Sequence, residues 1–308
     1  MGKGKIILID ANALLYRSFY ALPPLKTKEG FPTGGIYGFC RILMKLLKEE
    51  KPDYIACAFD KGKKTFRHEE SKEYKATRPK TPPQLSEQIP ILKEVLKGFN
   101  ISFFEKDEYE ADDILATIAR KAEKKGLEVK IFTADKDILQ IASDSVKIVQ
   151  FKKGVSKTQT FDHHKVKEEY GIYPQQIPDY LCLVGDTSDN IPGVEGIGPK
   201  TASSLIQRFG SLENLLSSLD RLPSPVAQKI RENAEKVKLS KRLATVVTEV
   251  PLDIDLETLR VKDPDLEKLL PVFEKLEFKK LEDKVREEYI NKGPSSTGSK
   301  ENLLFPLD

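Results

Sequence analysis

The stretch Lys-Ile-Ile-Leu-Ile-Asp, residues 5–10, is a short run of apolar, strand-favouring residues that ends in an acid. Similar runs lie at residues 54–59 and 129–132, and helical patterns at residues 36–50 and 84–97 separate them. Strands that alternate with helices are typical of a mostly parallel central sheet flanked by helices. The sequence therefore predicts an α/β fold.

The composition is that of a charge-rich globular protein. Of the 308 residues, 39% are hydrophobic and 32% are charged, and the net charge is +3. No apolar run is long enough to span a membrane and the start has no secretory pattern, so we expect a cytoplasmic protein. Cys40, Cys57 and Cys182 lack paired spacing and are predicted to be reduced core residues. Only three histidines are present, which disfavours a histidine-based metal site.

Each of the three predicted strands is followed by an acid. Asp10 ends the first run, Asp60 follows the second, and Asp135 and Asp137 follow the third. Ligands of an open parallel sheet bind beyond the carboxyl ends of its strands, so we expect these acids at one edge. Any one of them could instead cap a helix or begin a turn. A shared site is the favoured interpretation because all three strands show the feature.

Residues 109–119, Tyr-Glu-Ala-Asp-Asp-Ile-Leu-Ala-Thr-Ile-Ala, place three acids at the start of an apolar helical pattern. Acids in a first turn compensate the free amides and the helix dipole, so capping alone explains one or two of them. Glu110, Asp112 and Asp113 together repel one another, and a bound cation would relieve this repulsion. The polar turn at 185–190 adds Asp186 and Asp189.

Nine carboxylates are thus candidate ligands of one metal centre: Asp10, Asp60, Glu110, Asp112, Asp113, Asp135, Asp137, Asp186 and Asp189. Mg²⁺ prefers oxygen ligands and usually takes a few carboxylates, waters and a substrate phosphate. Two such ions about 4 Å apart are the arrangement for in-line displacement at phosphorus. A phosphatase, a sugar-phosphate enzyme or a nuclease could use such a centre.

The insertion at 61–83 favours a nucleic-acid substrate. It carries eight cations: Lys61, Lys63, Lys64, Arg67, Lys72, Lys75, Arg78 and Lys80. Basic side chains bind a phosphate backbone, and the interleaved Phe66 and Tyr74 offer stacking faces for bases. Such a charge run is often only a solvated face, but its position directly after Asp60 favours a role at the site.

A second nucleic-acid signal is Ile-Pro-Gly-Val-Glu-Gly-Ile-Gly-Pro-Lys-Thr-Ala, residues 191–202. The glycines allow a tight turn, and a helix that opens near Pro199 can offer amides to a phosphate. The pattern resembles a helix-hairpin-helix module, which holds the duplex backbone without reading sequence, and its spacing excludes a Walker P-loop. A plain turn between helices is the alternative. The DNA-binding candidates here are Gly196, Gly198, Lys200 and Thr201.

Five long motifs resemble the 5′-nuclease domain of bacterial DNA polymerase I, within the flap endonuclease superfamily. They are ILIDANALLYRSFYAL, FDKGKKTFRHEESKEYKATRPKTP, YEADDILATIA, TADKDILQI and GDTSDNIPGVEGIGPKTA, in the family's order, and the similarity runs from about residue 5 to about residue 284. The resemblance implies a structure-specific 5′ nuclease of replication and repair that removes flaps and RNA primers and acts at nicks. It also implies dependence on Mg²⁺, for which Mn²⁺ can substitute, and K⁺ at the helix-hairpin-helix.

The resemblance also implies roles for single residues. Asp10, Asp60, Glu110 and Asp112 match the first metal site, with Asp113 adjacent, and Asp135, Asp137, Asp186 and Asp189 match the second. Lys75 and Arg78 match cations of a helical arch that contact the scissile phosphate, and Tyr74 beside them is expected to stack on a base.

We expect a catalytic core at 1–165 with its arch at 61–83, a helical DNA-binding region at 166–290 with the hairpin near 191–208, and a flexible tail at 291–308. Short helical patterns at 179–183, 201–208 and 212–219 support the helical region. In the family a polymerase commonly follows, so a polymerase partner in cis or in trans and a monomeric nuclease are expected. A non-catalytic protein that binds branched DNA is the alternative function.

Overall fold

The computed structural model describes residues 4–62, 64–151 and 157–290. Lys63 of the basic insertion and the predicted tail at 291–308 lie outside the described residues. Within the described parts of the chain, no helix is both long and apolar enough to cross a membrane.

A six-stranded sheet forms the centre of the molecule, in the order β3-β2-β1-β4-β5-β6. Its strands are β1 (Lys5–Asp10), β2 (Tyr54–Ala58), β3 (Ser102–Phe104), β4 (Glu128–Thr133), β5 (Val146–Phe151) and β6 (Thr158–Phe161). All neighbours pair in parallel except β5 and β6, which are antiparallel. The predicted mostly parallel sheet is confirmed, and the strand order reverses between β1 and β4, where ligands of such sheets bind.

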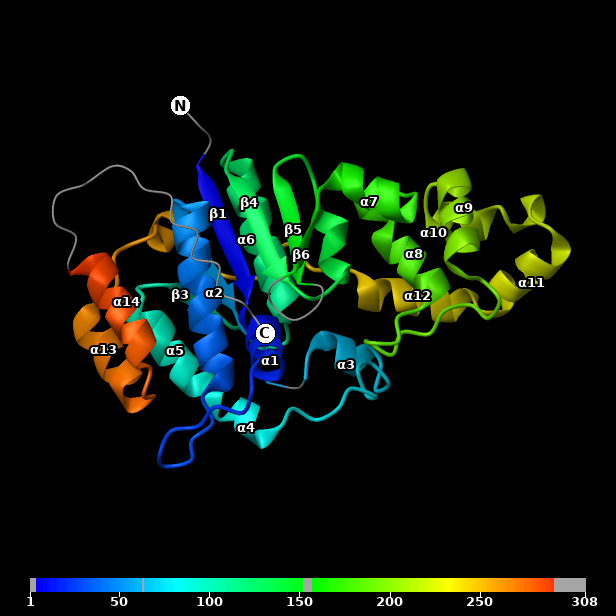
Figure 1. Cartoon of the computed structure of the whole chain (residues 1–308). Coiled ribbons are helices and arrows are strands. Elements are labelled where there is room, and N and C mark those ends of the chain that lie inside the picture. The colour runs from blue at the N-terminus through cyan, green and yellow to red at the C-terminus, as the bar shows by residue number, and fades with distance from the viewer. Residues whose placement is uncertain (1–3, 63, 152–156, 291–308) are drawn as a thin grey trace.

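One face of the sheet is covered by helices from both ends of the chain (Figure 1). Ile7 and Ile9 point to this face because side chains alternate along a strand. The helices are α1 (Ala11–Ala21), α2 (Gly34–Glu50), α5 (Gln88–Gly98), α13 (Leu266–Lys275) and α14 (Lys279–Tyr289). Their apolar sides and the sheet form one buried core.

Ile6 and Leu8 point to the other face, which α6 (Ala111–Lys124) covers. The same core continues through α8 (Ile177–Val184) into the remaining helices, so sheet and helical region share one apolar interior. These are η1 (Asp137–Ile141), α7 (His163–Tyr170), η2 (Pro174–Gln176), α9 (Pro199–Phe209), α10 (Leu212–Ser217), η3 (Leu219–Arg221), α11 (Ser224–Glu232), α12 (Ala234–Ala244) and η4 (Leu256–Leu259).

The helices of the predicted region 166–290 therefore do not all pack together. Helices α13 and α14 return to the α2 and α5 side, far from α9 and α11 (Figure 1). The buried ring of Phe273 lies 6.1 Å from that of Phe99 between ring centroids. The apolar side of α13 packs against α5, and this contact explains why the chain returns to this face of the sheet.

The basic insertion crosses the molecule beyond the carboxyl ends of the strands (Figure 1). Its regular structure is short: α3 (Phe66–Glu70), followed by turns and by α4 (Pro83–Ser86). The helix predicted at 84–97 is in fact broken at Glu87 into α4 and α5. The insertion thus begins and ends on the sheet edge that carries the acids.

Candidate metal centre and nucleic-acid interface

The end of β1 places Asp10 at the centre of the edge. Its carboxylate caps α1 by accepting from the backbone N–H of Ala13 at 2.9 Å, and its second oxygen accepts from the Thr133 hydroxyl at 3.1 Å. Thr133 ends β4, so the two strands at the reversal of strand order hold this side chain between them. The capping that sequence allows for Asp10 is therefore real and coexists with its place in the site.

The end of β2 and the start of α6 are joined by Asp60. Its carboxylate accepts from the first amide of α6, that of Ala111, at 2.8 Å, and its own N–H donates to the Asn12 side chain at 3.1 Å. Glu110 is the residue immediately before α6, and Asp112 lies in its first turn. The helix thus begins against the strand end, which brings its acids to Asp60.

Two tight turns supply the remaining acids. After β4, the N–H of Asp137 donates to the Asp135 carboxylate at 2.9 Å. The turn at 185–190 is closed by paired backbone hydrogen bonds between Asp186 and Ile191, both 2.8 Å, and it buries Asp186 and Asp189. Neither turn belongs to a strand, so the position of these acids depends on the packing of η1 and α8 beneath them.

Burial and mutual repulsion dominate the electrostatics of these groups. Burial and then the Asp60 charge raise the pKa of Asp10 to about 7. Burial, with Asp135 and then Asp10, raises the pKa of Asp112 well above its usual range. Burial, with Asp135 and then Asp189 and Asp186, does the same to the pKa of Asp137. These interactions link eight acids, the acid cluster: Asp10, Asp60, Glu110, Asp112, Asp135, Asp137, Asp186 and Asp189.

The acid cluster is incomplete without a cation. A buried oxygen of Asp112, one of Asp137 and one of Asp186 have no hydrogen-bond partner among the described residues, although the Asp186 oxygen faces the Lys136 ammonium. Buried polar atoms are nearly always hydrogen-bonded, and an orphaned carboxylate oxygen is the ligand atom that a hard divalent ion takes. The donor set is all carboxylate, which fits Mg²⁺ or Mn²⁺ and not a thiolate- or imidazole-seeking ion.

Besides Arg67, which lies 3.6 Å from Glu110, three basic side chains contact the acid cluster in the described parts of the chain. The Lys75 ammonium is 2.8 Å from Glu110, the Arg78 guanidinium 2.5 Å from Asp189, and the Lys136 ammonium 3.1 Å from Asp186. Although burial raises the pKa of Asp189, Lys75 and Arg78 lower it on balance below the usual value. The candidate site residues Lys75 and Arg78 thus contact acids of the cluster. Lys136 was not among the predicted site residues, although it lies between Asp135 and Asp137 in the chain.

Asp113 is not part of the acid cluster. Both of its oxygens accept from the Arg67 guanidinium, at 2.7 and 2.8 Å, and they also accept from the N–H groups of Glu110 and Val247. Its side chain is fully buried, and Arg67 donates further to the carbonyl of Leu243. The expectation that Asp113 is a metal ligand is therefore corrected, because its lone pairs are already used in a structural ion pair.

Tyr74 also differs from the expectation. It is only 2% exposed, and its hydroxyl donates toward Asp189 at 2.9 Å and Glu110 at 3.2 Å. Burial and these carboxylates raise the pKa of its hydroxyl. With its ring covered, Tyr74 holds the insertion on the acid cluster in this conformation and has no face free to stack on a base.

The predicted hairpin connects α8 to α9 through two close turns. Gly196 has φ of 80°, in the left-handed region that favours glycine. Gly193 packs so closely on the backbone of Val184 that a side chain there would clash. The backbone from 193 to 198 and Val184 line an open hollow of about 500 Å³.

The rest of the hairpin combines one buried side chain with exposed residues at the start of α9. Ile197 is buried and anchors the turn, with its N–H donating to the carbonyl of Val194 at 2.9 Å. Gly198 is the residue before α9, while Lys200 and Thr201 lie exposed in the first turn of α9. Exposed amides and a cation at a helix start suit a phosphate backbone.

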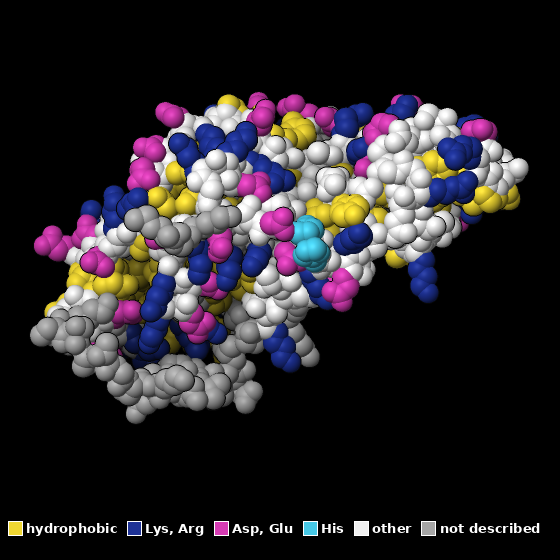
Figure 2. Space-filling view, turned by 90° about the horizontal axis from the view of Figure 1, so that it is seen from above, with side chains coloured by type: hydrophobic (Ala, Val, Ile, Leu, Met, Phe, Trp, Pro, Cys, Tyr) yellow, Lys and Arg dark blue, Asp and Glu magenta, His cyan; other side chains and the backbone are white. Residues whose placement is uncertain are grey.

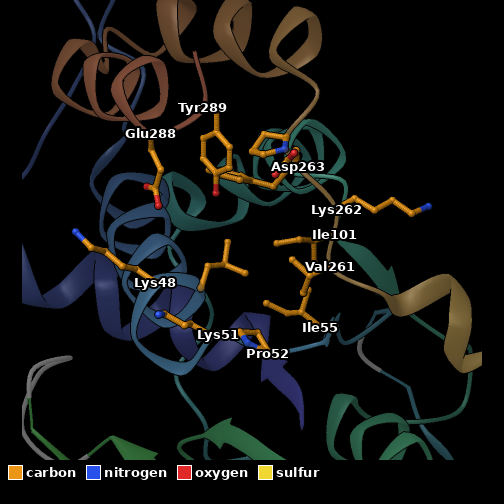
Figure 3. Close-up of a pocket in the computed structure, with 13 residues that line it drawn as sticks. Lys48, Lys51, Pro52, Ile55, Ile101, Val261, Lys262, Asp263, Glu288 and Tyr289 are labelled. Atoms are coloured by element: carbon orange, nitrogen blue, oxygen red, sulfur yellow. The ribbon is translucent and has the colours of Figure 1, made fainter. Parts of the chain in front are cut away.

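A separate cavity of about 340 Å³ lies away from the acid cluster, between the end of α2, the start of β2 and the end of α14 (Figure 3). Its walls are largely apolar and lysines surround the opening: Lys48, Lys51 and Lys262. It contains none of the predicted site residues.

Comparison with known proteins agrees with this geometry. The family model for the 5′-3′ exonuclease N-terminal resolvase-like domain matches residues 5–171, and that for the 5′-3′ exonuclease C-terminal SAM fold matches residues 172–267. The chain belongs to the 5′-3′ exonuclease family. The predicted membership is thereby confirmed.

Two relatives illustrate how this exonuclease chain relates to longer proteins. DNA polymerase I of Bacillus subtilis (strain 168) is 44% identical over 285 residues, covering 92% of this chain but 32% of the polymerase. A 5′-3′ exonuclease of Aquifex aeolicus (strain VF5) is 42% identical over 276 residues, covering 90% of this chain and 93% of that relative. The chain thus spans about a third of the polymerase and nearly all of the second relative.

Solved structures share the exonuclease fold. T5 5′-exonuclease, with bound divalent zinc ions, has a TM-score of 0.65 at 20% identity, covering 93% of this chain and 98% of that one. The catalytic core of Rad2 in complex with a DNA substrate has a TM-score of 0.61 at 18% identity, covering 92% and 91%. At these identities the likeness concerns the fold.

The raised carboxylate pKa values predict how the metal-free exonuclease responds to pH. The folded protein holds protons on Asp10 up to about pH 7, whereas the unfolded chain releases them near the ordinary value of 3.8. The folded state therefore binds more protons in this window, and the free energy of unfolding falls as pH rises through it. In EDTA, the melting temperature should decrease from about pH 5 to about pH 8. Saturating Mg²⁺ should raise the melting temperature most at the upper end of this pH range. A melting temperature independent of pH would contradict the raised pKa values.

The Arg67–Asp113 pair predicts a stability effect that metal does not rescue. Asp113→Asn removes the negative charge that two guanidinium donors face and leaves the buried Arg67 with only the longer contact to Glu110, at 3.6 Å. We expect a loss of about 3–5 kcal/mol in the free energy of unfolding, measured by urea denaturation with or without Mg²⁺. The neighbouring Asp112→Asn variant is the matched control, because it removes a repelled charge and should not destabilise the metal-free protein. If both variants were equally stable, Asp113 would again be a candidate metal ligand.

Proposed function

We propose that the chain is a Mg²⁺-dependent, structure-specific 5′ nuclease that hydrolyses phosphodiester bonds of flapped or nicked DNA and of RNA primers, in replication and repair. The observation that carries the proposal is the acid cluster, with its orphaned carboxylate oxygens beside basic side chains at the reversal of strand order. Simple phosphate binding would be weakened by eight acids, so this arrangement favours chemistry over a purely binding role.

Two groups of the acid cluster would hold divalent ions. Asp10, Asp60, Glu110 and Asp112 would form one site, and Asp135, Asp137, Asp186 and Asp189 the other. Two such ions, when bound, lower the pKa of an attacking water and stabilise charge on the phosphate and the leaving oxygen. Mg²⁺ is the proposed ion, and Mn²⁺, which also prefers carboxylate ligands, would substitute for it.

Lys75 and Arg78 would bind the scissile phosphate. Both contact the acid cluster directly, Lys75 with Glu110 and Arg78 with Asp189. Once ions neutralise the carboxylates, these cations have less negative charge to pair with and can face a phosphate instead. Donors fixed at this point would act on the charge that develops during cleavage.

The hairpin would hold the duplex beside the cut. Lys200 and Thr201 would contact the phosphate backbone, while Gly196 and Gly198 let that backbone approach closely. The hollow lined by residues 193–198 is the proposed place of a K⁺ ion. We further propose that the chain acts as a monomer in the cytoplasm, at the nucleoid, with a DNA polymerase as its partner in cis or in trans.

Asp112→Asn tests the metal-ligand role directly. The change keeps the shape of the side chain but removes its charge, so cleavage of a labelled 5′-flap duplex at saturating Mg²⁺ should fall by at least about a hundredfold. Binding of the same duplex in EDTA should be unchanged or tighter, because the DNA meets less negative charge. The exposed acid Asp253 provides the control Asp253→Asn, which should cleave normally. Near-normal cleavage by Asp112→Asn would refute the ligand role, and binding without cutting by the unaltered protein would favour the non-catalytic alternative.

Substitutions of the basic residues should have two kinds of effect, one on cleavage and one on DNA binding. Lys75→Ala and Arg78→Ala should reduce the single-turnover cleavage rate more than the affinity for flap DNA, because they act on the attacked phosphate. Lys200→Ala should instead weaken binding and reduce the salt dependence by about one phosphate contact. Fluorescence anisotropy at several salt concentrations and quenched-flow cleavage measure the two effects. If the Lys75 and Arg78 variants lost only affinity, their place at the scissile phosphate would be wrong.

A further inference from the structure

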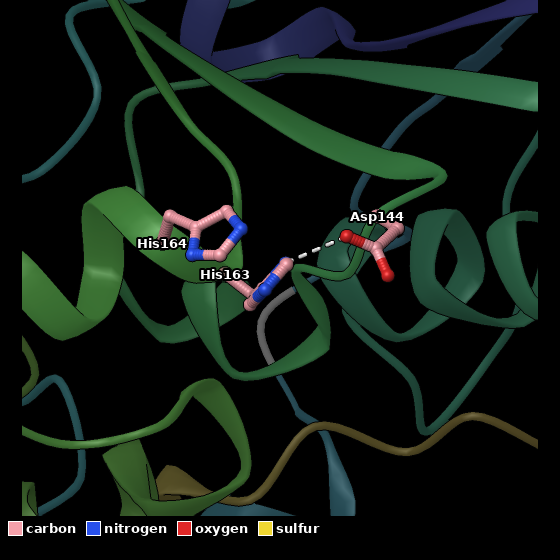
Figure 4. Close-up of side chains that lie close together, drawn as sticks. All are labelled: Asp144, His163 and His164. Atoms are coloured by element: carbon pink, nitrogen blue, oxygen red, sulfur yellow. Dashed lines mark ion pairs between the residues drawn. The ribbon is translucent and has the colours of Figure 1, made fainter.

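A second group of potential metal ligands lies at the opposite edge of the sheet from the acid cluster. Asp144, in the turn before β5, meets His163 and His164, the first two residues of α7 (Figure 4). One ligand atom from each of the three lies within 4.8 Å of the others. Viewed from above, the surface shows histidine side chains beside acidic ones (Figure 2).

The strand register explains why these residues meet. In the antiparallel pair of β5 and β6, Ile148 lies opposite Phe161. The start of β5 is therefore next to the end of β6, and Asp144 faces the residues that follow Phe161. The acid cluster lies beyond the other ends of the strands, roughly 20 Å away at the rise of a six-residue strand. The two groups are thus separate sites.

Both sides of the group are held in place by hydrogen bonds. The Asp162 carboxylate caps α7 by accepting from the N–H of Lys165 at 2.8 Å, which fixes the helix start. On the other side, the Ser143 and Ser145 hydroxyls donate to one oxygen of Glu123, at 2.5 and 2.7 Å, on either side of Asp144. Neither network uses a side-chain atom of the three potential ligands. Such supported positions lower the cost of binding an ion.

The side chains of Asp144, His163 and His164 already lie close enough together to bind one ion. His163 Nδ1 lies 3.1 Å from an Asp144 oxygen, and the two imidazole rings face each other at 3.8 Å between centroids, tilted by 38°. His163 is half-buried, whereas Asp144 and His164 are exposed, so an ion can enter from solvent. Two imidazoles and one carboxylate with an open fourth position suit Zn²⁺ and similar borderline ions, not Mg²⁺.

We propose that Asp144, His163 and His164 bind one divalent transition-metal ion, tying the start of α7 to the turn before β5. The small number of histidines in the chain disfavoured such a site, but two of the three lie together here. The site contributes to the stability of the β5–β6 edge and takes no part in cleavage at the distant acid cluster.

The three histidines also make the test specific. We would titrate Zn²⁺ into the full chain at saturating Mg²⁺ and follow the imidazole signals of His68, His163 and His164 by ¹H–¹⁵N NMR. Binding here should shift the His163 and His164 signals together and saturate at one ion per chain. His68, whose charge interacts with Glu110, reports separately on any exchange of ions at the acid cluster.

Matched variants distinguish this site from loose association of zinc with surface histidines. Asp144→Asn and His164→Ala should each weaken Zn²⁺ binding, read from the His163 signal, roughly tenfold or more, while Asp220→Asn, an exposed acid elsewhere, should not. Flap cleavage in Mg²⁺ without zinc should be the same for all three. The proposal is overturned if a tenfold excess of Zn²⁺ leaves the His163 and His164 signals unmoved, or if Asp144→Asn binds as tightly as the unaltered chain.

Discussion

Repulsion among the eight carboxylates of the acid cluster is the constraint that the surrounding structure answers. Parallel strands bring Asp10 and Asp60 to one edge, and the turns after β4 and α8 add further acids there, most of them partly or fully buried. For Asp10 alone, burial and then the Asp60 charge shift the pKa from 3.8 to about 7, which corresponds to roughly 4 kcal/mol against the charged form. The cations of the insertion and Lys136 offset part of this cost, and orphaned oxygens remain as the place where ions are still needed.

The neighbouring Arg67–Asp113 pair is an ion pair of a different kind. It is buried and complete, since the guanidinium donates to both Asp113 oxygens and to the carbonyls of Leu243 and Thr245. It joins the base of the insertion, the start of α6 and the chain after α12. Farther along the insertion, the buried Tyr74 and the half-buried Lys75 contact Asp189 and Glu110, and Arg78 is more exposed and donates to the carbonyl of Ser188. The insertion is thus fixed both at its base and on the acid cluster in this conformation.

Whether a feature of the fold or of the site could be predicted from the sequence depended on how far apart in the chain the interacting residues lie. The acids after β1, β2 and β4 were predictable because strand direction alone brings them together. Strands β3, β5 and β6 were not predicted. Ser-Phe-Phe of β3 and Thr-Gln-Thr-Phe of β6 carry little periodic signal, whereas the apolar run Val-Lys-Ile-Val-Gln-Phe of β5 was missed. Asp112 and Asp113 lie about 100° apart around a helix, so only one can face the acid cluster. Which one does so was decided by Arg67, 46 residues away in the chain.

The return of α13 and α14 has a consequence for the order in which the fold can form. Leu269 and Phe273 of α13 belong to the same buried core as Ile7 and Ile9 of β1. The core on this face therefore joins the first strand to one of the last helices of the described chain, and it cannot close until nearly all of that chain is present. Contacts between residues so far apart in sequence are the kind that slow folding.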